Sequence, residues 1–463
     1  MRLPDDLVIR SKQSQLEAAA SRDFSDNHCS RLEQVKDAPA TGKPPLSPIQ
    51  RHHSPSLQPK LSPPPRPAKS PTLHNPPHQH NHEYAPYRPP KRPQMESKPT
   101  VAVVNSSGRQ AASFIRVASA VGYHVRAHLR NLRSIVANEI ASLPNVQTFV
   151  GDLYTLERGT GRVNLPLIAD LFRGAQVAFI NTTFWSDEVA IGRALADAAK
   201  RVNVKHYIYS SMPDHSRFNP SWPSLPLWSA KTKVEDYVQE IGLPATFVYT
   251  GIYNNNFTSL PYPLFCMELQ KDGSFVWQSP FHPDVPLPWL DAEHDVGAAV
   301  LQLIKDGPRT WLNERIMLAY EMLSPTQACR LFEKGVGRPV RYVRGPVEVK
   351  VPIPAGYKEQ LEAVEKMYNL GRDDPKLQPP YFGCQKFERS CPEEALALWE
   401  GYRGLEEYAR EVFPVEEWNN GLTWMNEDDV EGTIDGGESV IDDDDGDSDV
   451  LTMGKRREET WLA

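Results

Sequence analysis

Beyond residue 100 the chain alternates between short, continuous apolar runs and longer segments in which apolar residues recur every three or four positions. The short runs are typical of buried strands, and the longer segments are typical of helices with one buried face. The first such helix places Ala111, Phe114, Ile115, Ala118 and Val121 on one side. The predicted strands are Val101–Asn105, His124–Leu129, Val146–Val150, Ala175–Asn181, Val204–Ser211 and Pro244–Gly251.

Strands and helices that alternate in this order predict an α/β fold, a Rossmann-type doubly wound parallel sheet. Between the strands, helices are expected over residues 132–143, 165–174, 187–203 and 230–242. The right-handed crossover rule leaves little choice of topology for such a series. We therefore assign residues 99–255 to one Rossmann domain.

After Gly251 the pattern becomes irregular, with loops and short strands rich in proline and aromatic residues. A helix follows at 291–306, where Asp291 or Asp295 can cap it, and another at 324–337, started by Ser324 and Pro325. Further amphipathic helices are predicted over 357–371 and 392–413. Residues 256–425 are thus predicted to form a smaller, mostly C-terminal α/β domain. Strands of this segment could return to the Rossmann sheet and extend it.

The two ends of the chain have compositions that do not support a packed core. Residues 1–98 contain 18 of the 43 prolines and 7 of the 13 histidines, and proline both fixes φ and lacks an amide donor. Residues 426–450 contain 12 acidic residues and no lysine or arginine. We predict that the Pro/His-rich extension, 1–98, and the acidic tail, 426–463, are disordered.

Charge and cysteine content exclude several classes of function. The net charge is −8 and the folded part lacks a basic stripe, which disfavours direct binding to nucleic acid. Cys384 and Cys391 have no second cysteine pair and no nearby histidine, so no metal site is predicted. No apolar run approaches the roughly 20 residues of a membrane span. The N-terminus has no apolar signal region, and we expect a soluble, intracellular protein.

The first candidate site is the turn between the first strand and the first helix, with the sequence NSSGRQA. A dinucleotide-binding turn uses three glycines, for the bend, for the approach of the pyrophosphate and for close helix packing. Only Gly108 is present here, because Asn105 and Ala111 occupy the outer positions. Asparagine can adopt the left-handed conformation. The turn therefore predicts pyrophosphate binding at the helix N-terminus. The alternative is a plain strand–turn–helix unit that binds no cofactor.

The end of the second strand bears on the choice of dinucleotide. An acidic residue there would bind the ribose 2′-hydroxyl. This chain has Leu129, Arg130 and Asn131 instead, and Arg130 could contact a 2′-phosphate or stack on adenine. NADP is therefore permitted as well as NAD, although Arg130 could also be a solvent-facing residue.

The residues of dehydrogenase chemistry are incomplete. A short-chain dehydrogenase has a serine after the fifth strand and a Tyr-x-x-x-Lys motif in the next helix, whose tyrosine donates the proton. Ser210, Ser211 and Lys231 are present, but Leu227 replaces the tyrosine and cannot transfer a proton. His215 could act as a base, although a loop histidine of this kind more often has a structural role. We therefore predict no catalytic residues.

Several longer motifs resemble the NmrA-like family of atypical short-chain dehydrogenases/reductases, which includes fungal regulators of nitrogen metabolite repression. They are NSSGRQAASFIRVA, AFINTT, ADAAKR, HYIYSSMPDHS, LPATFVYTGIYNNNFTSLPYPLF, PLPWLDAEHDVG and EEYAREVFP. The resemblance covers about residues 100–425. The N-terminal extension and the acidic tail depart from the compact core of the family.

By position, the resemblance implies a dinucleotide site from end to end. The phosphate turn would be Asn105, Ser106, Ser107, Gly108, Arg109 and Gln110; Arg130 and Asn131 would lie near the adenosine ribose, and Asp152 and Leu153 near adenine; Asn181, Thr182 and Thr183 would lie beside the nicotinamide half, with Lys231 reaching its ribose; and Tyr253, Asn254, Asn255 and Asn256 would line the nicotinamide end.

The resemblance also implies a function, which is binding of NAD or NADP, preferably oxidised, without catalysis. It implies a partner in the nucleus and cytoplasm, a GATA-type zinc-finger activator of nitrogen catabolism that the protein silences. Because such fingers are basic, the acidic segments Leu405–Glu417 and Asp291–Asp295 are candidate contact surfaces, although acidic helix faces are often only solvated. The alternatives are an NADP-dependent reductase of the isoflavone-reductase-like type that uses Lys231, and a scaffold with an inactive nucleotide site.

Overall fold

The structure, a computed structural model, describes residues 98–157, 160–184, 186–353 and 356–425. The predicted disordered segments, apart from Lys98, lie outside the described residues. All the described residues belong to one compact unit of the chain. Within the described ranges, no helix has the length and apolar character needed to cross a membrane.

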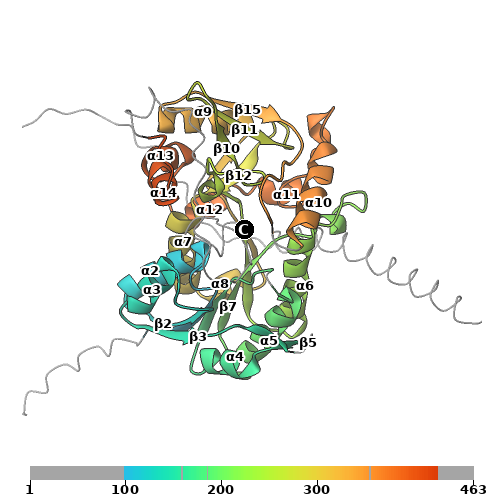
Figure 1. The fold of residues 1–463 in the computed structure, drawn as a ribbon. Helices are drawn as coiled ribbons and strands as arrows, with labels where there is room; N and C mark the ends of the chain where they lie inside the picture. Colours follow the sequence, from blue (N-terminus) through green and yellow to red (C-terminus); the bar gives the residue numbers. More distant parts are fainter. Residues whose placement is uncertain (1–97, 158–159, 185, 354–355, 426–463) are drawn as a thin grey trace, which may run out of the picture. The chain divides into compact units, whose positions relative to one another are not determined.

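A seven-stranded sheet forms the centre of the described unit, in the order β13-β8-β7-β6-β1-β2-β3, and every neighbouring pair of its strands is parallel (Figure 1). The predicted α/β, Rossmann-type sheet is thereby confirmed. Six of its strands are those that the apolar runs predict, and the seventh, β13, comes from the segment beyond residue 255. The strands are β1 Thr100–Val104, β2 His124–Leu129, β3 Val146–Val150, β6 Val177–Ile180, β7 His206–Ser211, β8 Ala245–Thr250 and β13 Arg315–Leu318.

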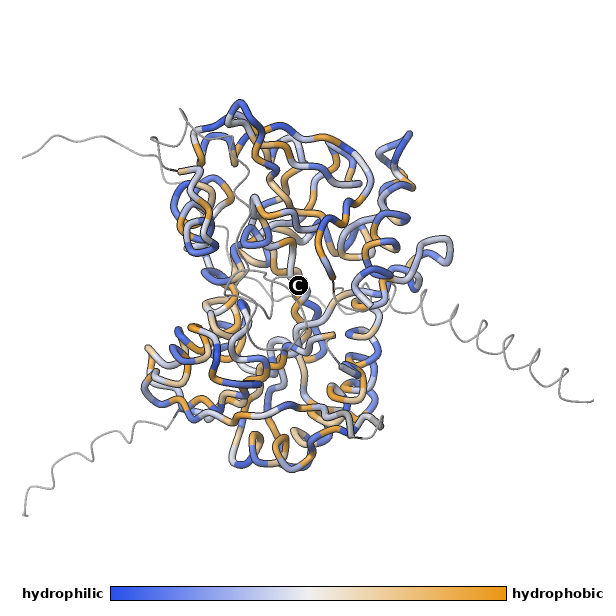
Figure 2. The backbone as a smooth tube through the Cα atoms, in the orientation of Figure 1, coloured by the Kyte–Doolittle hydropathy of each residue, from blue (hydrophilic) through white to orange (hydrophobic). Residues whose placement is uncertain are grey.

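Both faces of this sheet are buried. Along β1, Val101 and Val103 face one apolar cluster, which contains Phe114, whereas Ala102 and Val104 face the other. Figure 1 shows α2, α3 and α7 on one side, and α4, α5 and α6 on the other. In Figure 2 apolar and polar colours alternate along these helices, as one buried face requires. The helices are α2 Arg109–Ala120, α3 Ile135–Ser142, α4 Leu165–Phe172, α5 Glu188–Arg201, α6 Pro226–Glu240 and α7 Ala292–Asp306.

The rest of the described chain forms smaller sheets and C-terminal helices around a second part of the apolar core. One sheet has the strand order β10-β11-β15 and another β14-β12-β9, while β4 and β5 form a hairpin. The elements are β4 Tyr154–Glu157, β5 Thr160–Val163, β9 Ile252–Tyr253, β10 Met267–Leu269, β11 Phe275–Ser279, β12 Leu287–Leu290, β14 Glu321–Leu323, β15 Val340–Arg344, α8 Pro308–Trp311, α9 Pro325–Val336, α10 Tyr357–Asn369, α11 Gln385–Glu388, α12 Glu393–Leu398, α13 Leu405–Glu411, α14 Phe413–Asn419 and the 3-10 turns η1 His215–Arg217, η2 Asn254–Asn256 and η3 Pro375–Leu377.

The segment after residue 255 is closely joined to the sheet layer. It supplies strand β13, which pairs with β8, and helix α7, which packs on α2. Where these helices meet, a Cβ on Gly297 would lie 2.4 Å from the carbonyl oxygen of Ser113, so only glycine permits this approach. The amide of Gly297 also donates to Ser113 Oγ at 2.9 Å. The division into domains at residues 255 and 256 stays a prediction.

The prediction of a single helix over residues 392–413 is wrong. Helix α12 ends at Leu398, and the chain becomes helical again only in α13 and α14. Buried carboxylates bind the intervening segment. The amide of Arg403 donates to Asp295 at 3.0 Å, its guanidinium donates to Asp291 at 3.2 Å, and the amide of Leu405 donates to Glu321 at 2.7 Å. These tertiary hydrogen bonds replace the helical ones that the amphipathic pattern predicts.

Asn105 gives the first turn its shape, with a φ of 61°, in the left-handed region that its sequence position requires. We expect Asn105→Ala to lower the free energy of unfolding by about 1 kcal/mol. Alanine disfavours the left-handed conformation, because it has a Cβ but lacks the short polar side chain with which asparagine can form local hydrogen bonds. Asn105→Gly should stay within about 0.5 kcal/mol of the native protein, because glycine adopts positive φ freely. Urea denaturation measures both, with Asn419→Ala, on exposed helical backbone, as control. Equal effects of alanine and glycine would contradict this account.

His215, the candidate base, is a packed core residue. It is fully buried between Trp222 and Trp228, and its Nε2 lies 2.9 Å from the carbonyl oxygen of Pro380. Burial lowers the pKa of His215 to about 4. The imidazole is therefore neutral in the folded protein at neutral pH, and its role is structural.

This burial predicts a pH dependence of stability. The unfolded chain binds a proton on His215 near pH 6.5, whereas the folded chain does so only near pH 4. Stability from this group is complete above pH 6.5 and is lost as the pH falls toward 4, by up to about 3 kcal/mol. In urea titrations across this pH range, the free energy of unfolding of His215→Phe should fall less steeply than that of the native protein. His124→Gln, at an exposed histidine, should keep the native slope; an unchanged slope in His215→Phe would contradict the assignment.

Candidate functional site

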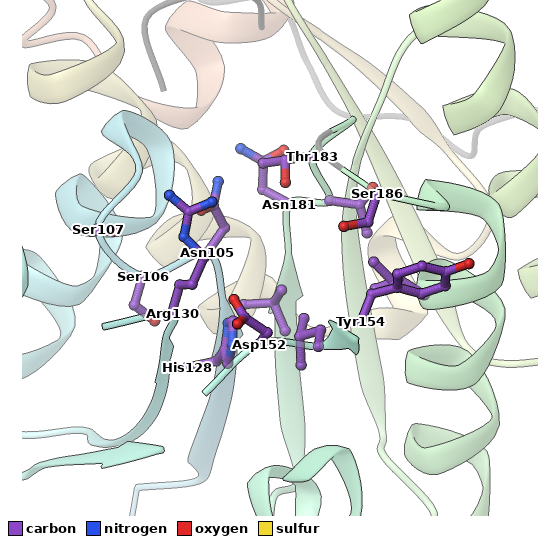
Figure 3. A pocket seen from close by; sticks show the side chains of 14 residues that line it. Asn105, Ser106, Ser107, His128, Arg130, Asp152, Tyr154, Asn181, Thr183 and Ser186 are labelled. Carbon is purple, nitrogen blue, oxygen red and sulfur yellow. The ribbon is translucent and has the colours of Figure 1, made fainter. Parts of the chain in front are cut away.

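A cavity opens at the carboxyl ends of the strands where the sheet order reverses between β1 and β6. This crevice is where doubly wound sheets bind ligands, because the connections from neighbouring strands there diverge to opposite faces. Figure 3 shows polar side chains that enter it from the ends of several strands. The cavity is lined by Val104, Asn105, Ser106, Ser107, His128, Arg130, Asp152, Leu153, Tyr154, Asn181, Thr182, Thr183, Ser186 and Ile191.

The structure brings together only part of the predicted site in this cavity. Asn105, Ser106, Ser107, Arg130, Asp152, Leu153, Asn181, Thr182 and Thr183 line it. The other predicted residues, which are Gly108, Arg109, Gln110, Asn131, Lys231, Tyr253, Asn254, Asn255 and Asn256, are not among its lining residues. The contacts of most of these residues are described below.

Sequence reasoning missed several lining residues, of which His128 and Tyr154 are the largest polar ones. His128 precedes Arg130 by two positions, so strand periodicity could have placed both on one face. Tyr154 comes from the β4–β5 hairpin, which has no clear apolar alternation. Ser186 precedes α5 and Ile191 lies in its first turn, whereas the predicted site residues of this segment end at Thr183.

The phosphate turn has the geometry of an anion site. The amide of Gly108 donates to the carbonyl of Asn105 at 2.9 Å, and the amide of Ser106 donates to that of His128 at 3.0 Å. Gly108 is the N-cap of α2, and no side chain caps this helix or adds an acid to its first turn. The first amides of α2 are therefore not covered by a cap, and with the helix dipole they favour an anionic group.

The side chains of Arg109 and Gln110 are held by residues far away in the sequence. Arg109 is buried and forms ion pairs with Glu293 at 2.6 Å and with Glu416 at 3.2 Å. Burial alone would lower the pKa of Arg109, but the two carboxylates raise it above its ordinary value. Gln110 donates to the hydroxyl of Tyr253. Both residues therefore present backbone amides, rather than side chains, at the phosphate turn.

One end of the cavity carries opposite charges on exposed side chains, those of Arg130 and Asp152. His128 lies beneath them, with its Nε2 2.8 Å from the carbonyl oxygen of Gly151, and burial lowers the pKa of His128. Asn131 instead accepts from the amide of Arg133 at 2.9 Å, which shapes the loop. This end has the size and polarity for the adenosine half of a dinucleotide, and Arg130 places a guanidinium group on its wall.

The other end is formed by the residues after β6. Lys231 lies behind Thr182, because its Nζ donates to the Thr182 carbonyl at 2.7 Å and to Glu188 Oε1 at 2.9 Å. Tyr253 and Asn254 belong to a neighbouring layer, in which Asn254 is fully buried and its side-chain amide has no partner among the described residues. Asn255 accepts from the amide of Ala292 at 2.9 Å and so fixes the start of α7.

Leu227 is the residue that the sequence analysis predicts at the proton-donor position of dehydrogenases. Leu227 lies in the first turn of α6 and is half-buried, and its amide donates to Gln360 at 3.0 Å. The nearby Tyr209 is fully buried, and burial raises its pKa well above its ordinary value. Within the described ranges no cluster of histidine, cysteine and acidic residues could hold a metal ion.

Comparison with known proteins gives the family. The NmrA-like family matches residues 97–409. The nitrogen metabolite repression protein nmr of Neurospora crassa is 59% identical over 404 residues, which cover 80% of this chain and 83% of that protein.

Two solved structures are similar over all of their length. They are crystal structures of NmrA, a negative transcriptional regulator, in complex with NAD and with NADP. Each is 55% identical, covers 72% of this chain and 100% of its own, and has a TM-score of 0.66. The match over most of the chain, together with a Rossmann sheet and a polar cavity at its switch point, shows that this protein belongs to the NmrA-like family.

Proposed function

We propose that this protein is a non-catalytic, NAD(P)-binding negative regulator of nitrogen metabolite repression, which binds and inhibits a GATA-type zinc-finger activator. The observation that carries the proposal is the combination of a polar cavity at the sheet's switch point with Leu227 at the proton-donor position. The similar regulator of Neurospora crassa supports the same role. We place its action in the nucleus and cytoplasm, by contact with protein rather than with nucleic acid or membrane.

The dinucleotide part of the proposal rests on the phosphate turn and on the two ends of the cavity. The uncapped start of α2 favours a pyrophosphate, and Arg130 suits the adenosine side of either NAD or NADP. Similar structures hold both NAD and NADP, which supports a site that accepts either. We expect the oxidised forms to bind more tightly than the reduced forms.

The non-catalytic part rests on Leu227 and Lys231. Leucine has no proton to transfer, and the ammonium of Lys231 is already paired with Glu188 and with a backbone carbonyl. The rival proposal is an NADP-dependent reductase in which Lys231 acts alone. Oxidation of NADPH by the purified protein with a carbonyl or quinone substrate, abolished by Lys231→Ala, would favour that rival.

The structure narrows the acidic surface proposed for the partner. Glu416 and Glu417 turn inward, to Arg109 and Ser259, and Asp291 is fully buried. These carboxylates stabilise the fold and are not available to a partner. Glu407 and Glu411, on α13, are exposed and remain as candidate contacts for a basic zinc finger.

We predict that Arg130→Ala weakens NADP binding about tenfold and NAD binding by no more than about threefold, because arginine contacts a 2′-phosphate that NAD lacks. Titration calorimetry with both dinucleotides measures this. Arg133→Ala, at an exposed arginine of the same loop, is the matched control and should leave both affinities unchanged. A folded Arg130→Ala protein with unchanged NADP affinity would refute the role of Arg130.

We predict that the double reversal Glu407→Lys and Glu411→Lys lowers capture of the GATA-type activator about tenfold in a pull-down, because it turns attraction into repulsion. The same reversal of Glu359 and Glu362, exposed on α10, is the control. Each pull-down is run with and without added NAD. No capture by the native protein under either condition would argue against the partner, whereas equal capture by both double variants would argue against this surface.

A further inference from the structure

Behind the cavity wall, Lys231 and Glu188 form an ion pair that is more buried than the other lysine–carboxylate pairs of the described residues. The side chains are 10% and 4% exposed, and Nζ lies 2.9 Å from Oε1. Burying two charges in this way costs free energy unless further hydrogen bonds satisfy them. Lys231 gains one such bond from the carbonyl of Thr182, at 2.7 Å.

Glu188 is also held by hydroxyl groups. Thr182 Oγ1 donates to Glu188 Oε1 at 2.7 Å, because an ionised carboxylate can only accept. Tyr209, whose hydroxyl lies 2.8 Å from Thr182 Oγ1, must then be the donor in that contact. Burial raises the pKa of Tyr209 well above its ordinary value, so it keeps its proton. The carboxylate of Glu188 is thereby held in place by the ammonium of Lys231 and the hydroxyl of Thr182.

This carboxylate lies one layer behind the wall of the cavity. Thr182, which contacts both Glu188 and Lys231, lines the cavity, as do Ser186 and Ile191 on either side of Glu188 in the sequence. Figure 3 shows Asn181, Thr183 and Ser186 at this end, away from Arg130. Glu188 is moreover the first residue of α5, where it offsets the positive end of the helix dipole as well as the charge of Lys231.

An oxidised nicotinamide ring is a cation and a reduced ring is neutral, so a site that distinguishes them must respond to one unit of charge. Lys231 alone, beside Thr182, would repel the oxidised ring. Glu188 cancels that charge. The oppositely charged residues that do line the cavity, Arg130 and Asp152, belong to the adenosine end and differ little in their effect on the two forms.

We infer that Glu188 is the residue that sets selectivity for oxidised over reduced dinucleotide, by neutralising Lys231 and the N-terminus of α5 behind the nicotinamide half of the cavity. The inference rests on the proposed function, since it requires that the cavity binds a nicotinamide dinucleotide. Glu188 is a specificity residue that acts through charge, and it does not need to contact the ring.

The test measures the dissociation constants of NAD and NADH by titration calorimetry and takes their ratio as the selectivity. Glu188→Gln keeps the shape and an acceptor but leaves the charge of Lys231 uncompensated. We expect it to lower the selectivity about five- to thirtyfold, mainly through weaker NAD binding, as a unit charge at partly screened short range predicts. Asp187→Asn removes the neighbouring exposed acid and keeps a good helix cap, so it should leave the ratio unchanged.

A double variant keeps the inference testable if the lone buried lysine destabilises the fold. Glu188→Gln combined with Lys231→Met removes both charges, and we expect its selectivity to return to within about threefold of the native value. Thermal unfolding checks that each variant is folded. Two results would overturn the inference. One is a folded Glu188→Gln protein with native selectivity. The other is a double variant whose selectivity falls as far as we expect for Glu188→Gln alone. A native protein that binds neither NAD nor NADH overturns the proposed function instead.

Discussion

The structure depends on the need to cover both faces of a parallel sheet. Along β1, alternate residues face two separate apolar clusters, and helices close both sides. A sheet buried in this way leaves only its edges and the ends of its strands accessible. The cavity therefore lies where it must, at the carboxyl ends of the strands and beside the point where the connections diverge.

Closing one of these faces requires the C-terminal half of the chain. Helix α7 reaches α2 only because Gly297 has no side chain, and its start is fixed by Asn255 and Asp291. The first residue of α2, Arg109, is paired with Glu293 of α7 and with Glu416 of α14. Arg109 thus joins the start of α2 to α7 and to α14, and so ties the turn before α2 to the C-terminal half of the chain.

The distribution of buried charge supports our proposal of a binding site without catalysis. The cavity keeps a left-handed turn at Asn105 and an uncapped helix start, which are the backbone features that hold a pyrophosphate. Behind its other end, Lys231 is paired with Glu188, and Leu227 lies in the first turn of α6. This arrangement is why we propose recognition of a dinucleotide without catalysis.

The sequence by itself determined the α/β class, the six strands from Val101 to Gly251, and the left-handed turn at Asn105, because each follows from local periodicity or from the conformational range of one residue type. Only the tertiary structure decided the rest. It added β13 to the sheet, broke the predicted helix 392–413, and turned Arg109 and Glu416 toward each other. These outcomes depend on contacts between residues far apart in the chain, such as Arg403 with Asp295, which no local pattern records.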